Sequence, residues 1–281
     1  MRDLLVALLA ELDWALSNSR REGLRLNLET IGGWGHPLLA TPSARRAAAR
    51  AIFRSYHRGF LEYLSHRRLA SGARFEGAEK LYRALAHGRG AVITAPHLGN
   101  WELAALALAR LGFRVRVVSG VQYHAALAGA VRAAKESSRI EVSTPEDGFL
   151  PLVATLRRGG LVLLLADGDV YARGLPVRLF GAPASLPVGP ALLARRAGAP
   201  IVHAYALRER DGSHRIVFES TDRPDRARGV SEDVTRLTEG VARSLERAIA
   251  ANVTQWCIFR PLLPAEPVAS PEPPKVVTRA A

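Results

Sequence analysis

Residues 91–112 read AVITAPHLGNWELAALALARLG. This stretch begins with a short apolar run rich in β-formers, Ala91–Ala95, and continues from Trp101 as a helical pattern. A proline and a glycine separate the two parts, Asn100 is expected to cap the helix, and Glu102 falls in its first turn, where a carboxylate suits the helix dipole. The stretch therefore predicts a strand, a turn at Pro96–Gly99 and a helix.

The same alternation of strand and helix continues along the chain. Short β-rich runs predict strands at Ala91–Ala95, Arg114–Val118, Leu161–Ala166, Ile201–Leu207 and Arg215–Glu219. Helical patterns occupy Trp101–Leu111, Ala125–Lys135, Phe149–Arg157, Gly189–Ala197 and Ser231–Ala250. This order is typical of an α/β fold with a mostly parallel central sheet flanked by helices.

The first third of the chain is expected to be an N-terminal helical region. Helices are predicted at Arg2–Leu16, Arg20–Ile31 and Ser43–Leu69. The last of these is amphipathic and rich in arginine, so it is either a core helix with a solvated outer face or a helix near a membrane surface. We expect one domain over residues 1–263, with a membrane-proximal helical part at 1–75, an α/β core at 76–263 and a disordered Pro-rich tail at 264–281.

The charge and the composition restrict the partners. The formal net charge of +13 favours an anionic partner such as nucleic acid, an acidic carrier protein or phospholipid headgroups. No zinc-finger, RNP or heptad pattern is present, so nucleic acid is not expected. The longest apolar runs, Leu4–Ala10 and Leu161–Ala166, are too short to span a bilayer, and no secretory signal is expected.

A metal site and a disulfide framework are both unexpected. Cys257 is the single cysteine of the chain. The histidines are scattered and lack the paired spacing that metal ligands show.

Three histidines are followed five positions later by a glutamate: His57/Glu62, His97/Glu102 and His214/Glu219. Within a helix, five residues place two side chains about 140° apart, and within a strand an odd spacing sends them to opposite faces. The first pair lies in a predicted helix and the third in a predicted strand, so neither is expected to meet. Only His97 and Glu102 flank a strand–turn–helix junction, which is also where ligands bind in open α/β sheets.

This arrangement suits general-base chemistry. Glu102 would accept a hydrogen bond from one imidazole nitrogen of His97, and the other nitrogen would take a proton from a hydroxyl. With no Ser or Cys nucleophile evident nearby, direct attack of that hydroxyl on an acyl group is simpler than an acyl-enzyme. Backbone amides at the helix start would stabilise the oxyanion. From spacing and context alone, a structural capping role for His97 stays open.

The residues also carry a resemblance to a known family. Residues 96–103, PHLGNWEL, resemble the His-x4-acid block (HxxxxE) of the lysophospholipid acyltransferase superfamily, in the form of its lipid A and phosphatidylinositol-mannoside branch. Three further blocks resemble that branch in the same order: RLNL at 25–28; LLLADGDV at 163–170 with Gly174, Val177, Phe180, Gly181, Pro187 and Gly189; and Gln255-Trp256 with Phe259-Arg260. The agreement runs from about Arg25 to about Arg260.

The resemblance implies a glycerolipid acyltransferase-like fold, with His97 as the base and Glu102 as its orienting partner. It implies an O-acyltransferase that moves a fatty acyl chain from acyl carrier protein or acyl-CoA to a hydroxyl of a glycolipid or phospholipid, with no other cofactor. The expected location is peripheral, on an anionic membrane surface at the cytoplasmic face of the inner (plasma) membrane.

Further residues are expected to bind substrate. These are Asn100, Lys135, Asp167, Asp169, Arg178 and Arg208. Their alternatives are a polar turn for the two aspartates and solvated surface charges for the two arginines.

The chain also departs from the family pattern at Ser119–Gln122, Gly168 and Arg139, which leaves the acceptor and the activity open. Two other functions stay under consideration. One is thioester hydrolysis, and the other is a non-catalytic basic protein that binds membranes.

Overall fold

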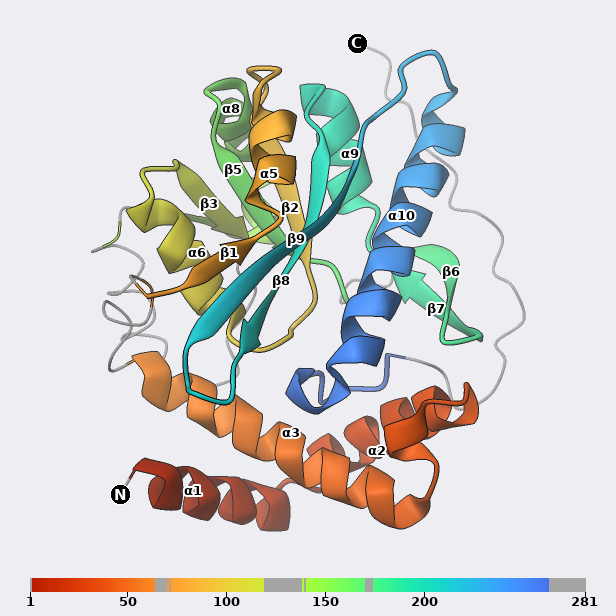
Figure 1. Cartoon of the computed structure of the whole chain (residues 1–281). Coiled ribbons are helices and arrows are strands. Elements are labelled where there is room, and N and C mark those ends of the chain that lie inside the picture. Colours follow the sequence, from red (N-terminus) through yellow and green to blue (C-terminus); the bar gives the residue numbers. More distant parts are fainter. Residues whose placement is uncertain are drawn as a thin grey trace.

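The computed structural model describes residues 2–63, 70, 72–118, 138, 140–169 and 174–262. Its centre is a seven-stranded sheet with the strand order β1-β9-β8-β2-β5-β3-β4 (Figure 1). Neighbouring strands are parallel except β8 and β9, which form an antiparallel pair. The predicted α/β class, with a mostly parallel sheet and an N-terminal helical region, is confirmed.

The strands and helices have the following bounds. The strands are β1 Arg74–Glu76, β2 Ala91–Ala95, β3 Val115–Val118, β4 Glu141–Ser143, β5 Leu161–Leu165, β6 Leu175–Leu179, β7 Ala182–Leu186, β8 Ile201–Arg208 and β9 His214–Asp222. The α-helices are α1 Arg2–Leu16, α2 Asn18–Gly33, α3 Pro42–Tyr63, α5 Ala78–Leu85, α6 Trp101–Arg110, α8 Leu150–Arg157, α9 Gly189–Ala197 and α10 Val230–Ala251. Short 3-10 turns lie at Pro37–Leu39, Pro145–Asp147 and Val253–Gln255.

Strand β2 is buried on both faces. Ala91 and Ile93 belong to a hydrophobic cluster with α5 and α6, whereas Val92 belongs to another with α8, α9 and α10. Because side chains alternate across a strand, an unbroken apolar run is what a strand covered by helices on both faces requires. This burial fixes the position of the turn that follows β2.

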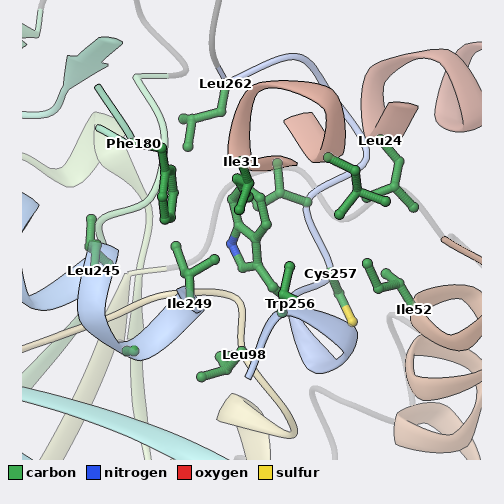
Figure 2. Packing of buried hydrophobic residues seen from close by; sticks show 14 of the residues in the cluster. Leu24, Ile31, Ile52, Leu98, Phe180, Leu245, Ile249, Trp256, Cys257 and Leu262 are labelled. Atoms are coloured by element: carbon green, nitrogen blue, oxygen red, sulfur yellow. The ribbon is translucent and has the colours of Figure 1, made fainter. Parts of the chain in front are cut away.

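The N-terminal helices lie across the end of the sheet at which β8 turns into β9 (Figure 1). Since β8 is parallel to β2, this is the end where β2 and β5 finish. A third hydrophobic cluster joins these helices to α10 and to residues 256–262. Figure 2 shows the fully buried Trp256 in this cluster, close to Ile31 and Ile249.

Helix α3 is a core helix, which is one of the two roles that the sequence left open, and its position near a membrane surface stays a prediction. Ile52 and Phe53 are buried in the third cluster, as expected for a core helix. Its outer arginines Arg50 and Arg58 pair with Glu11 and Asp3 of α1, so α1 covers part of the arginine-rich face.

Several elements differ from the sequence prediction. The strands β1 and β4 have only three residues each, and the β6–β7 hairpin contains two prolines, so none of them carries a strong strand pattern. The predicted helix Ala125–Lys135, residues 64–69 of the predicted Ser43–Leu69 helix and the predicted tail lie outside the described residues.

Candidate active site

The pairing of β2 with β5 brings two of the predicted residues together. Ala95 of β2 is directly opposite Leu165 of β5, and the Ala166 amide extends the ladder by donating to the Ala95 carbonyl over 2.9 Å. His97 and Asp167 each follow this last pair by two residues. Parallel strands end at the same edge of a sheet, so both side chains emerge there.

Asp167 receives three hydrogen bonds. Its Oδ1 accepts from Nδ1 of His97 over 2.7 Å. Its Oδ2 accepts from the His97 backbone amide over 2.7 Å and from Nε1 of Trp256 over 2.8 Å. With the Asp167 side chain only 1% exposed, these donors replace the water that a carboxylate needs.

The contacts set the charge of Asp167 and the tautomer of His97. Burial by itself raises the pKa of Asp167, but the His97 charge and the hydrogen bonds from His97 and Trp256 outweigh it and lower this pKa. Asp167 is therefore a carboxylate at neutral pH and can only accept, which places the proton of neutral His97 on Nδ1. The His97 side chain is 29% exposed, and in the described part of the chain its Nε2 has no hydrogen-bond partner.

The turn that carries His97 is held rigidly by the C-terminal segment. The His97 carbonyl accepts from the Cys257 amide over 2.8 Å, and the Gly99 amide donates to the Gln255 carbonyl over 3.0 Å. Gly99 has φ of +61°, and a Cβ there would lie 2.2 Å from the Ala206 carbonyl oxygen. Only glycine fits this position, because it combines a left-handed backbone with a close approach to β8.

The hydrogen-bond partner of His97 is Asp167 and not Glu102, which the sequence predicted. Glu102 lies in the first turn of α6, and Nδ1 of His97 donates to Asp167 instead. The pairing of β2 with β5 brings Asp167 next to His97. The spacing between His97 and Glu102 contains no information about that pairing. A catalytic contribution of Glu102 stays a prediction.

Asn100 caps α6, as predicted, and is buried. Its Oδ1 accepts from the Leu103 amide over 3.1 Å, and its Nδ2 donates to Oε2 of Glu62 on α3 over 2.7 Å. The helix start beside His97 is therefore tied to an N-terminal helix, and the predicted substrate contact of Asn100 stays untested.

Arg208 is not a solvated surface charge, which was the alternative to its substrate role. Its Nε and Nη2 donate to the two Glu62 oxygens over 2.5 and 2.8 Å, and its Nη1 donates to Oγ of Ser55 over 3.0 Å. The Arg208 and Glu62 side chains are 7% and 3% exposed. His214 completes the group by donating from Nε2 to Glu62 over 3.1 Å. This network joins α3 to β8 and β9 and gives Arg208 a structural role, whereas its predicted contact with substrate stays a prediction.

Replacing Glu62 with glutamine is expected to lower the free energy of unfolding at pH 7 by about 3 kcal/mol, because it leaves the Arg208 charge buried without its partner. Burial raises the pKa of Glu62, but hydrogen bonds from Arg208 and His214 outweigh it and lower the pKa to about 2. Because this pKa is lower in the folded state, the Glu62 carboxylate contributes its full stabilisation at pH values above its unfolded-state pKa, about 4.3. This contribution to the free energy of unfolding is lost as the pH falls towards 2.

Urea unfolding at pH 7 and pH 3 measures both effects. The difference in the free energy of unfolding between wild type and Glu62→Gln should be smaller at pH 3 than at pH 7. The exposed Glu79, which is 4.0 Å from Arg83, provides the matched control, and Glu79→Gln should change the free energy of unfolding by less than about 0.5 kcal/mol. A Glu62→Gln variant as stable as wild type at pH 7 would contradict this assignment.

The other predicted residues are more scattered. Oδ2 of Asp169 accepts from the Gly174 amide over 2.6 Å and from Oγ of Ser185 over 2.8 Å, so it connects the end of β5 to the β6–β7 hairpin. Arg178 is exposed and donates to the Gly181 carbonyl within that hairpin. Lys135 lies outside the described residues.

Sequence reasoning missed the roles of two buried residues. The sequence marks Trp256 only as part of a motif, yet its indole donates to the carboxylate that holds His97. The spacing relates Glu62 only to His57, and the two are not expected to meet; His57 donates from Nε2 to Asp13 over 2.8 Å. A glutamate within an apolar helical pattern was the available signal, since such a carboxylate must find buried donors.

Comparisons with known proteins identify the family of this chain. The sequence model of the family described as bacterial lipid A biosynthesis acyltransferase matches residues 2–264. A phosphatidylinositol mannoside acyltransferase from Mycobacterium tuberculosis (strain CDC 1551 / Oshkosh) is 31% identical over 248 residues, which is 85% of this chain and 76% of the relative. A protein of the same name from Mycolicibacterium smegmatis is 28% identical over 253 residues, which is 88% of this chain and 81% of the relative. The chain therefore belongs to the bacterial lipid A biosynthesis acyltransferase family and is an acyltransferase.

Proposed function

We propose that this acyltransferase moves a fatty acyl chain from a carrier thioester to a hydroxyl of a glycolipid or phospholipid, with His97 as the general base. The observation that carries the proposal is the 2.7 Å contact between Nδ1 of His97 and the buried carboxylate of Asp167. It leaves Nε2 as the nitrogen that acts on the substrate.

The reaction needs no covalent enzyme intermediate. Nε2 of His97 takes the proton of the acceptor hydroxyl while the hydroxyl oxygen attacks the thioester carbonyl. The tetrahedral intermediate then collapses, the thiolate leaves, and the imidazolium returns the proton to the sulfur. The products are the new ester and the free carrier thiol. Asp167 stabilises the transient imidazolium, as a buried carboxylate does in hydrolase triads.

The oxyanion donors come from the start of α6 in this proposal. The amides of His97, Leu98 and Gly99 already donate to Asp167, Pro96 and Gln255. Amides in the first turn of a helix have no partner within the helix and carry the positive end of its dipole. The Trp101 amide, at the first helical position, suits this role.

The names of the relatives support a lipid acceptor. Both are phosphatidylinositol mannoside acyltransferases, so an acceptor of that glycophospholipid class is the first to test. We propose acyl carrier protein or acyl-CoA as the donor, with no other cofactor. The net charge of +13 supports either donor, because carrier proteins are acidic and coenzyme A carries phosphates.

Helix α1 supports a peripheral position on an anionic membrane, which we propose to be the cytoplasmic face of the inner membrane. Four leucines, Leu4, Leu8, Leu12 and Leu16, recur every fourth residue and are 54–77% exposed. Such spacing forms one apolar stripe, and a helix of this kind lies in the interface plane of a bilayer. None of the described helices is both long enough and apolar enough to span a membrane.

Replacing Leu4 and Leu8 with serine is expected to weaken binding to vesicles of anionic phospholipid by about tenfold per residue, because each exposed leucine then loses its apolar burial. Vesicle cosedimentation measures the change. Leu111→Ser is the matched control, since Leu111 is 55% exposed and follows α6 at the opposite end of the sheet. Equal vesicle binding by wild type and the double variant would show that α1 does not contact the membrane.

The transfer reaction is tested with labelled palmitoyl-CoA or palmitoyl carrier protein and a phosphatidylinositol mannoside mixture, with products resolved by mass spectrometry. The proposal expects an acylated lipid that wild type forms and His97→Ala does not. Release of free palmitate with acceptor present would indicate a thioesterase. No product, together with salt-sensitive vesicle binding, would indicate a non-catalytic binding protein.

A further inference from the structure

Asn27 is a buried residue to which the proposed reaction gives no role. It is fully buried in α2, yet its partners lie at the other end of the chain. Its Nδ2 donates to the Arg260 carbonyl over 2.8 Å, and its Oδ1 accepts from the Leu262 amide over 2.8 Å. The two bonds hold the backbone on both sides of Pro261 in a fixed position.

A glycine in α2 holds the same segment from the side. A Cβ at Gly23 would lie 2.3 Å from the Phe259 carbonyl oxygen and 3.0 Å from Cα of Arg260. This close contact admits no side chain at residue 23. Together with Asn27, it fixes where the Arg260 side chain begins.

The guanidinium of Arg260 lies against Gly168, the residue after Asp167. A Cβ at Gly168 would lie 2.2 Å from Nη2 and 3.1 Å from Cζ of Arg260, so the guanidinium occupies the space that a side chain at residue 168 would take. This places it within about 4 Å of the Gly168 Cα and one residue from the carboxylate that holds His97.

The charge of Arg260 has no counter-ion in the described part of the chain. Arg260 is half-buried, and no described carboxylate forms an ion pair with it, whereas Arg208 and Arg195, which are also withdrawn from solvent, are paired with Glu62 and Asp233. A cation partly withdrawn from water is costly unless an anion approaches it. The guanidinium lies beside the proposed reacting centre, where an anionic group of a bound substrate would meet it.

We propose that Arg260 binds a phosphate group of a substrate at the active site and that Asn27 is its positioning residue. A guanidinium presents a planar fork that pairs with two phosphate oxygens at once. The inference rests on the proposed function, because both proposed substrates carry phosphate: a phosphodiester in the glycophospholipid acceptor and phosphate esters in the acyl donor. The experiment distinguishes the two sources.

Binding is measured by calorimetry with two pairs of soluble probes, so that the result does not depend on turnover. Glycerophosphoinositol and myo-inositol differ by the phosphodiester, and coenzyme A and pantetheine differ by the phosphates. We expect Arg260→Gln to weaken binding of one phosphate-bearing probe by about 10- to 100-fold and to leave its phosphate-free counterpart unchanged. Arg158→Gln is the matched control, because Arg158 is exposed and precedes β5, at the opposite end of the strands from Arg260.

The probe that responds identifies the source. A loss confined to glycerophosphoinositol assigns the phosphate to the acceptor, and a loss confined to coenzyme A assigns it to the donor. Equal binding of all probes by Arg260→Gln and wild type would overturn the proposal. If wild type binds the probes in this way but transfers no acyl chain, the proposed function fails and the phosphate site stands.

Two further variants separate a binding role from a structural one. Gly168→Ala should displace the guanidinium and weaken the same probe, with little added loss in the Gly168→Ala/Arg260→Gln double variant. Arg260→Lys keeps the charge but not the fork, so it should restore part of the binding. Two results would contradict the contact: additive losses of probe binding in the double variant, or probe binding by Arg260→Lys that is no tighter than that by Arg260→Gln.

Discussion

Replacing His97 with alanine is expected to lower kcat for acyl transfer by about 10²- to 10⁴-fold, the range in which a general base contributes. The variant lacks the nitrogen that we propose takes the hydroxyl proton. The fold should survive, because Asp167 keeps its bonds to the residue 97 amide and to Trp256. Transfer of labelled palmitate under saturating substrates, together with the circular dichroism melting curve, measures both expectations.

The control for this variant is another histidine. His87 is exposed and precedes β2, at the opposite edge of the sheet from His97. His87→Ala should therefore retain the wild-type kcat. A His97→Ala enzyme with a kcat within twofold of wild type would show that another group takes the proton.

Replacing Asp167 with asparagine is expected to lower kcat by a similar factor. The side chain keeps its size, but its amide can donate to Nδ1 of His97 and thereby favour the tautomer in which Nε2 carries the proton. The imidazolium formed during the reaction also loses its counter-charge. Steady-state kinetics should show the loss mainly in kcat, because Asp167 is buried and, in our proposal, acts on the substrate only through His97.

A double-mutant cycle tests whether Asp167 acts through His97. If it does, His97→Ala/Asp167→Asn should be about as slow as His97→Ala alone, because the carboxylate has nothing left to orient. The melting temperatures of all variants are needed, since the asparagine side chain introduced by Asp167→Asn would bury an amide donor where the wild type has only acceptors. Additive losses would assign Asp167 a separate role.

Much of the fold is predictable from this sequence, because its central strands are buried on both sides. The apolar runs around Ile93, Val162 and Val202 have no other stable location than between two helical layers. The short edge strands β1 and β4 depend on pairing with β9 and β3, which a local pattern does not contain. The antiparallel pairing of β8 with β9 follows from their short connection, which leaves no room for a crossover helix.

The site is predictable only in part. The turn between β2 and α6 identifies His97, and the polar residues after β5 identify Asp167 as a neighbour. The choice between Asp167 and Glu102 depends on which strand lies beside β2, and a linear pattern does not specify strand order. The contacts of Asn27 with Arg260 and of Glu62 with Arg208 join residues more than a hundred positions apart, so they arise only in the folded chain.

The central claim is that the buried carboxylate of Asp167, two residues after β5, orients His97 as the general base. It is tested most directly by the rates of two variants, Asp167→Asn and Glu102→Gln, measured in one transfer assay. Both variants exchange a carboxylate for an amide of the same size. Our account predicts that Asp167→Asn is at least about 100-fold slower than wild type and much slower than Glu102→Gln. The account would be contradicted by an Asp167→Asn enzyme that transfers acyl chains at the wild-type rate while Glu102→Gln has lost activity.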